Sequence, residues 1–457
     1  MKFATLEGRR IAVWGCGREG RAALAALHRH LPRQVVTLFC REAEAAALAA
    51  DPRVTVATQA PDADTLAAFD HVIKSPGISI YKPEIGAAQA RGTVFTSGTA
   101  LWFGENPDAR VIAITGTKGK STTSAMTAHI ARTLGLRTAL AGNIGLPLLE
   151  LDGQTADLWV VELSSFQTGE AGPVDVGVVL NLYEEHLDWH GSRERYFNDK
   201  LKLAAAARTL VANAGHAGLM ARTAAHPQRV TFGAEADWHV RGDALWHGQV
   251  RMAALADVLG QVPGRHNWLN ACAALTALDT LYGFDADTAQ AATQALASFH
   301  TLPHRLQRLG ERGDRLWIND SISTTPEASR AALESLPGHA VTLIVGGFDR
   351  GLDWSGFARF VDTRPGLRLV VQGANGPRIA QTLRDVHSAV VWREAVGLDD
   401  AVAVARRISA TGDAIVLSPG APSFDQFRNY AERGRHFAEL AGFDGDRLGR
   451  IAGLGIA

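Results

Sequence analysis

The feature of the sequence that most restricts its fold is a repeated pair of segments. A short apolar run ends near glycine, serine or asparagine, and a stretch with the apolar spacing of a helix follows. The clearest runs are residues 11–14, 111–114, 159–161, 176–180, 341–345 and 414–417. Runs of this kind are typical of strands that are buried on both faces of a parallel sheet. The pattern therefore predicts an α/β fold of parallel sheets covered by helices.

The chain length of 457 residues favours about three domains. Two changes in composition indicate where they meet. Residues 104–108 (GENPD) are rich in turn formers just before the run at 111, and residues 299–303 (FHTLP) separate an alanine-rich helical stretch from a new set of strands. We expect domains at 1–106, 107–300 and 301–457, the outer two Rossmann-like and the central one similar to a P-loop ATPase.

Charge and cysteine content exclude several classes of protein. The 46 basic and 47 acidic side chains give a net charge of -1, so no overall positive field draws the chain to nucleic acid or to an anionic membrane. Cys16, Cys40 and Cys272 are widely spaced, which argues against a disulfide framework or a structural zinc site. The charged amino terminus and the lack of a long apolar segment indicate a cytoplasmic protein with small-molecule partners.

Residues 116–122 (GTKGKST) form the strongest local motif, because they lie between an expected strand and a helix expected to begin near Thr122. In such a loop, glycines let backbone N–H groups surround a phosphate. Lys120 can reach a β- or γ-phosphate, and the Ser121 hydroxyl can hold Mg²⁺. The full phosphate-loop pattern needs glycine at position 114, where this chain has Ile114, so the motif is a shortened variant. A tight turn without a ligand is the alternative.

Residues 15–20 (GCGREG) also follow a strand and open a helix, a position that suits a diphosphate. A nicotinamide-dinucleotide site would need an acidic residue at the end of the next strand, but residues 38–41 read LFCR. The diphosphate is therefore expected to belong to another nucleotide. The glycines could also serve only strand-to-helix packing.

Three polar residues between the glycine loop and position 202 could converge on a phosphate-bound metal. Glu162 ends an apolar run, where a buried charge needs either a cation or a salt bridge. His186 fits a metal ligand and a structural histidine equally well. Lys200 lies in a helical stretch beside Lys202 and, from the residues alone, belongs to a solvated face.

Eight motifs occur in the order found in Mur ligases, and they span nearly the whole chain. They are residues 116–122 (GTKGKST), 142–145 (GNIG), 162–167 (ELSSFQ), 185–188 (EHLD), 264–267 (GRHN), 304–305 (HR), 319–321 (NDS) and 418–425 (SPGAPSFD). The chain most resembles the MurD type, which adds glutamate to UDP-N-acetylmuramoyl-L-alanine. Eight ordered motifs are far more specific than any one of them.

The resemblance implies a role for each matching position. ATP would be bound by Gly116, Thr117, Lys118, Gly119, Lys120, Ser121, Thr122, Asn267, Asn270, Arg305 and Asp320. Mg²⁺ would lie near Ser121, Glu162, His186 and Lys200, the last of which is carbamylated in this family. The UDP substrate would contact Gly15, Gly17, Arg18, Glu19, Gly20, Ser75, Pro76, Gly77 and Asn143. Glutamate would contact Thr324, Arg350, Ser423 and Tyr430. The catalytic residues would be Lys120, Glu162, His186 and Lys200.

The chemistry implied is phosphorylation of the alanine carboxylate by ATP, followed by attack of the glutamate amine on the acyl phosphate. Where MurD-type ligases often have DSKATN, this chain has DSISTT at 320–325, so Ile322 replaces a cation. This segment, residues 418–423 and residues 453–456 (GLGI) are similar to the branch that adds L-glutamate, whose product is epimerised by a separate enzyme. D-glutamate stays an alternative acceptor. A folylpolyglutamate synthase, a nicotinamide-dependent oxidoreductase and a nucleotide-gated binding protein are the other functions compatible with the glycine loops.

Overall fold

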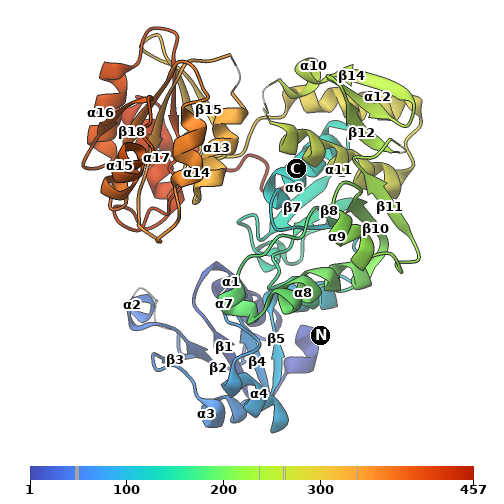
Figure 1. Ribbon diagram of the computed structural model, residues 1–457. Helices are drawn as coiled ribbons and strands as arrows, with labels where there is room; N and C mark the ends of the chain where they lie inside the picture. The colour runs from blue at the N-terminus through green and yellow to red at the C-terminus, as the bar shows by residue number, and fades with distance from the viewer. Residues whose placement is uncertain (47–50, 236, 261, 263, 337) are drawn as a thin grey trace. The chain divides into compact units, whose positions relative to one another are not determined.

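The computed structural model describes every residue except 47–50, 236, 261, 263 and 337. The described residues pack into two compact units. The first comprises Met1–Val258, Leu269–Ala297 and Gly453–Ala457, and the second comprises Leu259–Trp268 and Ser298–Ala452. Both are mixed α/β structures in which parallel strands predominate, as the sequence predicts (Figure 1). The three domain boundaries expected from composition stay predictions.

The first sheet of unit 1 is fully parallel, with the strand order β3-β2-β1-β4-β5. Its elements are η1 (Phe3–Leu6), β1 (Ile11–Trp14), α1 (Arg18–His30), β2 (Val36–Phe39), α2 (Glu42–Ala45), β3 (Val54–Ala57), α3 (Ala63–Ala67), β4 (His71–Lys74), α4 (Pro83–Ala90), β5 (Val94–Thr96) and α5 (Gly98–Glu105). Trp14 is paired in register with both Phe39 and Lys74. The turns after β1 and β4, which carry two of the predicted substrate motifs, therefore leave the same edge side by side.

The second sheet of unit 1 has the strand order β11-β10-β9-β6-β8-β7-β21. Its elements are β6 (Val111–Thr115), α6 (Lys120–Thr133), β7 (Thr138–Gly142), η2 (Leu148–Leu151), β8 (Leu158–Glu162), η3 (Thr168–Glu170), β9 (Val174–Val179), α7 (Leu187–His190), α8 (Arg193–Ala206), β10 (Ala207–Asn213), α9 (Ala217–Arg222), β11 (Arg229–Phe232) and β21 (Gly455–Ile456). All pairs are parallel except β21, which returns from the end of the chain and pairs antiparallel with β7. Arg132 on α6 donates hydrogen bonds to the carbonyl oxygens of Gly453 and Gly455, at 2.7 and 2.9 Å.

A small antiparallel sheet and three helices complete unit 1 and lead into unit 2. The strands are β12 (Trp238–Arg241), β13 (Ala244–His247) and β14 (Val250–Ala254). The helices are α10 (Leu255–Leu259), α11 (Arg265–Tyr282) and α12 (Ala286–Ala295), and η4 (Leu296–Ser298) follows. The alanine-rich stretch is thus helical, and Phe299–Pro303 lies in a loop, as composition indicates.

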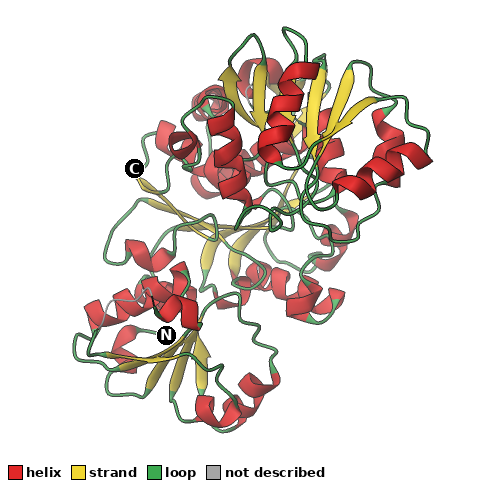
Figure 2. Ribbon diagram, turned by 90° about the vertical axis from the view of Figure 1, so that its left-hand side faces the viewer, coloured by secondary structure: helices red, strands yellow, loops and turns green. Residues whose placement is uncertain are grey.

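Unit 2 contains one six-stranded sheet in the order β15-β16-β20-β17-β18-β19. Its elements are β15 (Gln307–Glu311), β16 (Leu316–Asn319), α13 (Pro326–Glu334), β17 (Val341–Val345), α14 (Ser355–Val361), β18 (Leu367–Val371), α15 (Gly376–Asp385), β19 (Val391–Glu394), α16 (Leu398–Ile408), β20 (Ala414–Leu417), α17 (Tyr430–Leu440) and α18 (Gly445–Leu448). Only β15 runs antiparallel to its neighbour. Separate apolar clusters fill the two faces of the sheet, and Figure 2 shows helices flanking the strands.

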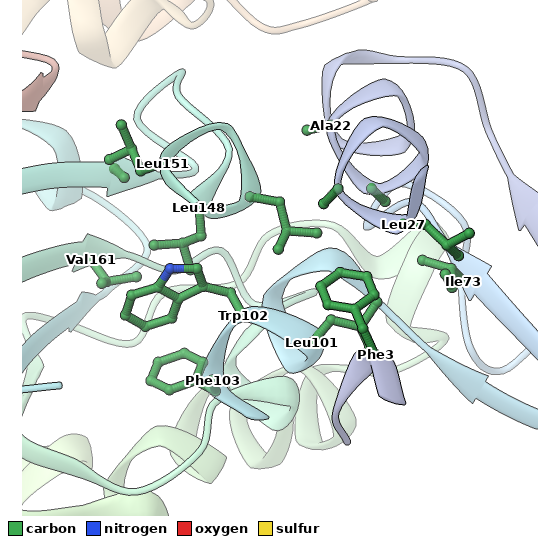
Figure 3. Packing of buried hydrophobic residues seen from close by; sticks show 14 of the residues in the cluster. Phe3, Ala22, Leu27, Ile73, Leu101, Trp102, Phe103, Leu148, Leu151 and Val161 are labelled. Carbon is green, nitrogen blue, oxygen red and sulfur yellow. The ribbon is translucent and has the colours of Figure 1, made fainter. Parts of the chain in front are cut away.

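One apolar core joins the two main sheets of unit 1. It runs from Leu27 on α1, through Trp102 on α5, to Val161 on β8 (Figure 3). The Trp102 ring centroid lies 5.1 Å from that of Phe103 and 4.6 Å from that of Trp159. Because this core is continuous, the turns of the first sheet are held firmly against the loops of the second.

Three expectations from the sequence are wrong in detail. Residues 104 and 105 are not part of a turn-rich link, because α5 continues to Glu105. Gly104 packs so closely there that a Cβ atom would lie 1.8 Å from the carbonyl oxygen of Met1. Helix α6 begins at Lys120 rather than near Thr122, and β9 ends before Leu180. Cys16, Cys40 and Cys272 are free cysteines.

Candidate active site

The glycine loop connects β6 to α6, as the motif predicts. Gly119 is the N-cap of the helix and has φ 89°, a left-handed conformation that favours glycine. A Cβ atom there would lie 2.5 Å from Oδ1 of Asn270. Backbone conformation and space therefore both require glycine, and the following N–H groups form a helix amino end that suits a phosphate.

The lysines of the loop have different environments. The Nζ atom of Lys120 donates to the carbonyl oxygens of Gly116 and Thr117, at 3.0 and 3.1 Å, so this ammonium lies over the loop itself. Lys118 instead forms an ion pair with Glu185, at 2.6 Å. Of the two, Lys120 is the cation placed to meet a phosphate held by the loop.

Glu162 is the last residue of β8 and is 1% exposed. It is paired in register with Ile114 on β6, so it leaves the sheet at the same edge as the glycine loop. Its Oε1 atom accepts a hydrogen bond from Nδ2 of Asn143 at 2.7 Å, whereas its buried Oε2 atom has no hydrogen-bond partner in the described part of the chain. A buried carboxylate oxygen without a donor fits a cation, so of the two explanations that the sequence left open, the structure favours the cation.

The donor set fits Mg²⁺ rather than a metal held by protein alone. Within the described residues no group of three or more His, Cys, Asp or Glu side chains is arranged to hold a metal. Mg²⁺ usually binds one or two carboxylates together with waters and substrate phosphates. Glu162 and the hydroxyl of Ser121, in the first turn of α6, suit that kind of site.

Lys200 does not belong to a solvated face. It lies on α8, is 1% exposed, and donates to the carbonyl oxygen of Gly116 at 3.1 Å. Burial lowers the pKa of this amine well below its ordinary value, and the charge of Lys120 acts in the same direction. The lowered pKa enlarges the fraction of neutral amine, which is the form that is nucleophilic enough to add CO₂.

His186 precedes α7 with φ 55° and ψ 40°, a conformation that is rare for residues other than glycine. Its ring centroid lies 5.2 Å from that of Phe166, on the loop after β8, and half of the side chain is exposed. Burial lowers the pKa of His186 despite the opposing charge of Glu185. A neutral, half-exposed imidazole beside the Glu162 loop is suited to bind a metal.

Sequence reasoning missed a hydrogen-bond network beneath these residues. Asp199, His190 and Ser165 are almost fully buried, and His190 lies 2.7 Å from Asp199 and 3.0 Å from Ser165. Burial alone would raise the pKa of Asp199, but hydrogen bonds from Lys202, Tyr81 and His190 outweigh it and lower the pKa. The carboxylate is therefore ionised. The only signal in the sequence was that Asp199 directly precedes Lys200.

The glycines of residues 15–20 have separate tasks. A Cβ atom on Gly15 would lie 2.5 Å from Oγ of Ser75, and one on Gly20 would lie 1.8 Å from the Gly15 carbonyl oxygen. These two glycines are required for packing, the alternative that the sequence left open. A Cβ atom on Gly17, the N-cap of α1, would meet nothing within 4 Å, so this position leaves room for a ligand.

Two charged residues follow Gly17 on the first turn of α1. Arg18 lies 3.8 Å from Glu150. Burial raises the pKa of Glu19 to about 7, with the charges of Glu170 and Glu150 acting in the same direction. Arg18 is thus the side chain that would attract a diphosphate at this helix end, and an ionised Glu19 would repel it.

In unit 2, the loops after β16, β20 and β17 leave the same edge of the sheet, because Leu417 pairs with both Asn319 and Ile344. These loops carry the predicted residues Asp320, Thr324, Arg350 and Ser423. Tyr430 is the first residue of α17, and Arg305 precedes β15. Asn267 lies in the first turn of α11 and is 6% exposed.

Both carboxylate oxygens of Asp320 are bonded within unit 2. Oδ1 accepts from the backbone N–H of Leu306 at 3.0 Å, and Oδ2 accepts from the hydroxyls of Ser323 and Ser418. Burial nevertheless raises the pKa of Asp320 to about 6. This side chain joins the loops after β16 and β20 to the segment before β15, and a nucleotide contact would have to replace one of these hydrogen bonds.

Residues 114–278 match the Mur ligase middle domain. Over the full length of both chains, the sequence is 47% identical to the UDP-N-acetylmuramoyl-L-alanine–L-glutamate ligase of Xylella fastidiosa (strain 9a5c). It is 36% identical to the enzyme of that name from Salinispora tropica, over 96% of this chain and 98% of that one. The chain belongs to the Mur ligase family. It is therefore an enzyme of the ligase class, as the ordered motifs predict.

Solved Mur ligases share the fold. UDP-N-acetylmuramate–alanine ligase MurC from Thermotoga maritima superimposes with a TM-score of 0.59 at 22% identity, covering 94% of this chain and 98% of that one. MurF from Thermotoga maritima, solved in complex with ADP, gives a TM-score of 0.54 at 17% identity, covering 97% and 96%. At these identities the likeness concerns the fold alone, and the α/β prediction is confirmed.

Proposed function

We propose that this protein is an ATP- and Mg²⁺-dependent ligase that joins L-glutamate to UDP-N-acetylmuramoyl-L-alanine in peptidoglycan precursor synthesis. The full-length relatives at 45–47% identity are named for this reaction. The observation that carries the proposal is the cluster of Lys120, Lys200 and Glu162 around the glycine loop, which combines a phosphate cradle, a buried amine and an open carboxylate oxygen. This combination suits phosphoryl transfer.

The reaction begins with transfer of the γ-phosphoryl group of ATP to the alanine carboxylate, which yields ADP and an acyl phosphate. The glutamate amine then attacks the carbonyl carbon, and phosphate leaves from the tetrahedral intermediate as the amide forms. Bound Mg²⁺ would neutralise phosphate charge, held by Ser121 and Glu162, with His186 and Lys200 nearby. Lys120 would bind the transferred phosphoryl group, and the packed core beneath the loops keeps these groups in place.

The remaining predicted contacts belong to this proposal. The UDP moiety would bind at Gly17 and Arg18, with the turn of residues 75–77 beside it, because these lie together at one sheet edge. Glutamate would bind on unit 2 at the loops that carry Thr324, Arg350 and Ser423 and at Tyr430, the first residue of α17.

The acceptor and the cellular setting are further parts of the proposal. L-glutamate is favoured over D-glutamate because residues 319–326, 418–423 and 453–456 resemble the branch that adds L-glutamate and because the relatives are named for L-glutamate. A separate epimerase would then act on the product. In the described chain no helix is long and apolar enough to cross a membrane, and we propose a cytoplasmic enzyme.

One assay tests the reaction. Purified protein is incubated with ATP, Mg²⁺ and UDP-N-acetylmuramoyl-L-alanine, and L- or D-glutamate is supplied in separate reactions. We expect ADP to form in proportion to a new amide product, detected by mass spectrometry, with L-glutamate only. ADP release without an amino acid would favour a nucleotide-gated protein, and nicotinamide absorbance changes without ATP consumption would favour an oxidoreductase. Equal turnover of both enantiomers would refute the choice of acceptor.

A further inference from the structure

Asp199 is the centre of a buried network that the proposed chemistry does not use. It lies on α8 and is 4% exposed. Its Oδ1 atom accepts hydrogen bonds from the hydroxyl of Tyr81 and from Nζ of Lys202, both at 2.7 Å. Its Oδ2 atom accepts from Nδ1 of His190, also at 2.7 Å. Tyr81 follows β4 of the first sheet, so this carboxylate connects the two main sheets of unit 1.

The network continues into the loop after β8. The hydroxyl of Ser165 lies 3.0 Å from Nε2 of His190, and Thr168 donates to the backbone carbonyl oxygen of Asp199 at 2.7 Å. This loop begins directly after Glu162, whose Oε2 atom is open to a cation. Asp199 therefore fixes the position of the loop through two separate routes.

The network also holds the turn after β4. Ser79 donates to the carbonyl oxygen of Trp189 at 2.6 Å, and the indole N–H of Trp189 donates to the carbonyl oxygen of Pro76 at 3.1 Å. Trp189 is next to His190 on α7. Residues 75–77, the turn proposed to hold the UDP substrate, are thus tied to the same helix as Asp199's partner.

The residue after Asp199 is Lys200, whose amine reaches the glycine loop at the Gly116 carbonyl oxygen. Because Tyr81 and His190, from two other segments, both bond the Asp199 carboxylate, α8 has little freedom to rotate, and the position of the Lys200 amine is set by its neighbour. Reacting groups must be placed closely, because a displacement of about 1 Å costs about 100-fold in rate.

We propose that Asp199 is a positioning residue. It holds the UDP-substrate turn of residues 75–77, the loop that follows Glu162, and Lys200 in one fixed arrangement. The proposal rests on the ligase function proposed above. Asp199 touches neither substrate nor phosphate in this account, and it acts through Tyr81, His190 and the helix that it shares with Lys200. A network that served stability alone would affect folding and leave the turnover of folded enzyme unchanged.

The test compares Asp199→Asn, Tyr81→Phe and the double variant with wild type. Asparagine keeps the shape but replaces one acceptor oxygen by a donor. We expect Asp199→Asn to lower kcat by about 10- to 100-fold with the KM for ATP within about threefold. Tyr81→Phe is expected to weaken calorimetric binding of UDP-N-acetylmuramoyl-L-alanine several-fold. Because the Tyr81 hydroxyl donates to Asp199, the double variant should lose less than the sum of the two single effects.

Tyr282→Phe is the matched control, since it removes a phenol hydroxyl from α11, where the ring lies against Arg110. This control should bind and turn over like wild type. Circular dichroism and melting curves establish that each variant is folded, and Tyr81→Phe serves alone if Asp199→Asn does not fold.

The proposal would be overturned if folded Asp199→Asn kept kcat within twofold of wild type, or if the Tyr81→Phe and Asp199→Asn effects were additive. If only Tyr81→Phe folds, unchanged binding of UDP-N-acetylmuramoyl-L-alanine by that variant would overturn the proposal. If the wild type neither binds the UDP substrate nor makes the amide, the ligase function itself is refuted. If the wild type is active and the variants are unaffected, only the positioning role of Asp199 is refuted.

Discussion

Replacing Lys200 by methionine is expected to abolish ligation and at the same time to stabilise the fold at neutral pH. The Lys200 side chain is 1% exposed. In the described part of the chain its Nζ atom lies 3.1 Å from the Gly116 carbonyl oxygen, 3.5 Å from Oγ1 of Thr115 and 5.0 Å from the centroid of the Tyr196 ring. Methionine has a similar length and no charge. The Gly116 carbonyl oxygen would keep its hydrogen bond from Lys120 at 3.0 Å, so the change leaves no orphaned acceptor there.

The magnitude follows from proton linkage. Burial lowers the pKa of Lys200 well below its ordinary value of 10.5. At a pH between the lowered pKa of the folded chain and the ordinary pKa of the unfolded chain, the unfolded chain binds one more proton. The free energy of unfolding of the wild type therefore rises with pH in this range. The slope contributed by Lys200 is about 1.4 kcal/mol per pH unit. The variant lacks this contribution, so its advantage is largest at neutral pH and disappears as the pH approaches 10.

The measurement is chemical unfolding of both proteins at several pH values between 7 and about 10, a window set by the ordinary lysine pKa. Buffers free of CO₂ prevent a carbamate from forming. At pH 7 we expect the variant to be more stable by at least about 1 kcal/mol, or about 1–2 °C in melting temperature for a chain of this length. Exposed Lys2 provides the matched control, and Lys2→Met should change neither stability nor turnover. A variant that is less stable than wild type at pH 7, or a difference independent of pH, would refute the reasoning.

Three further predictions concern the loops. Lys120→Ala should eliminate amide formation while changing the free energy of unfolding by less than about 1 kcal/mol, because a phosphate contact is lost and not a core contact; turnover at the wild-type rate would contradict this. Gly119→Ala should destabilise the fold by about 1–2 kcal/mol and weaken nucleotide binding in titrations, because a Cβ atom is strained at φ 89° and meets Asn270. The pKa of Glu19 is raised to about 7 in the folded chain. Its contribution to the free energy of unfolding is therefore fully present below about pH 4.5 and is lost as the pH rises through 7. Glu19→Gln should therefore gain up to about 3 kcal/mol over wild type between pH 4.5 and 8, and unfolding curves that stay parallel across this range would disprove it.

The interior strands could be predicted because burial on both faces leaves a continuous apolar run in the sequence. The bounds of β1, β17 and β20 agree with the apolar runs. The edge strands β3 and β19 carry mostly exposed or half-exposed residues and have no such run, so nothing local distinguishes them from loops. Strand β21 could not be predicted from the sequence either, because two residues are too few to show the alternation of apolar and polar side chains that marks a strand.

The motifs located the site, but composition could not separate packing from binding. Gly15, Gly17 and Gly20 look alike in the sequence, and only the three-dimensional neighbours show that the first and last fill tight contacts while Gly17 leaves space. Helical spacing placed Lys200 on a solvated face, and only the family resemblance moved it into the site. Burial of a lysine is decided by tertiary packing, which no local pattern records.

The consecutive residues Asp199 and Lys200 show how one helix meets two opposite requirements. The Asp199 carboxylate is ionised, and it fixes α8 in place by accepting hydrogen bonds from Tyr81 and His190. The amine beside it donates to the Gly116 carbonyl oxygen, and its lowered pKa enlarges the fraction of uncharged amine. Because a buried charge is tolerated only when it is paired, the hydrogen-bonded carboxylate of Asp199 can provide rigidity. The amine of Lys200, whose pKa is lowered, can provide reactivity.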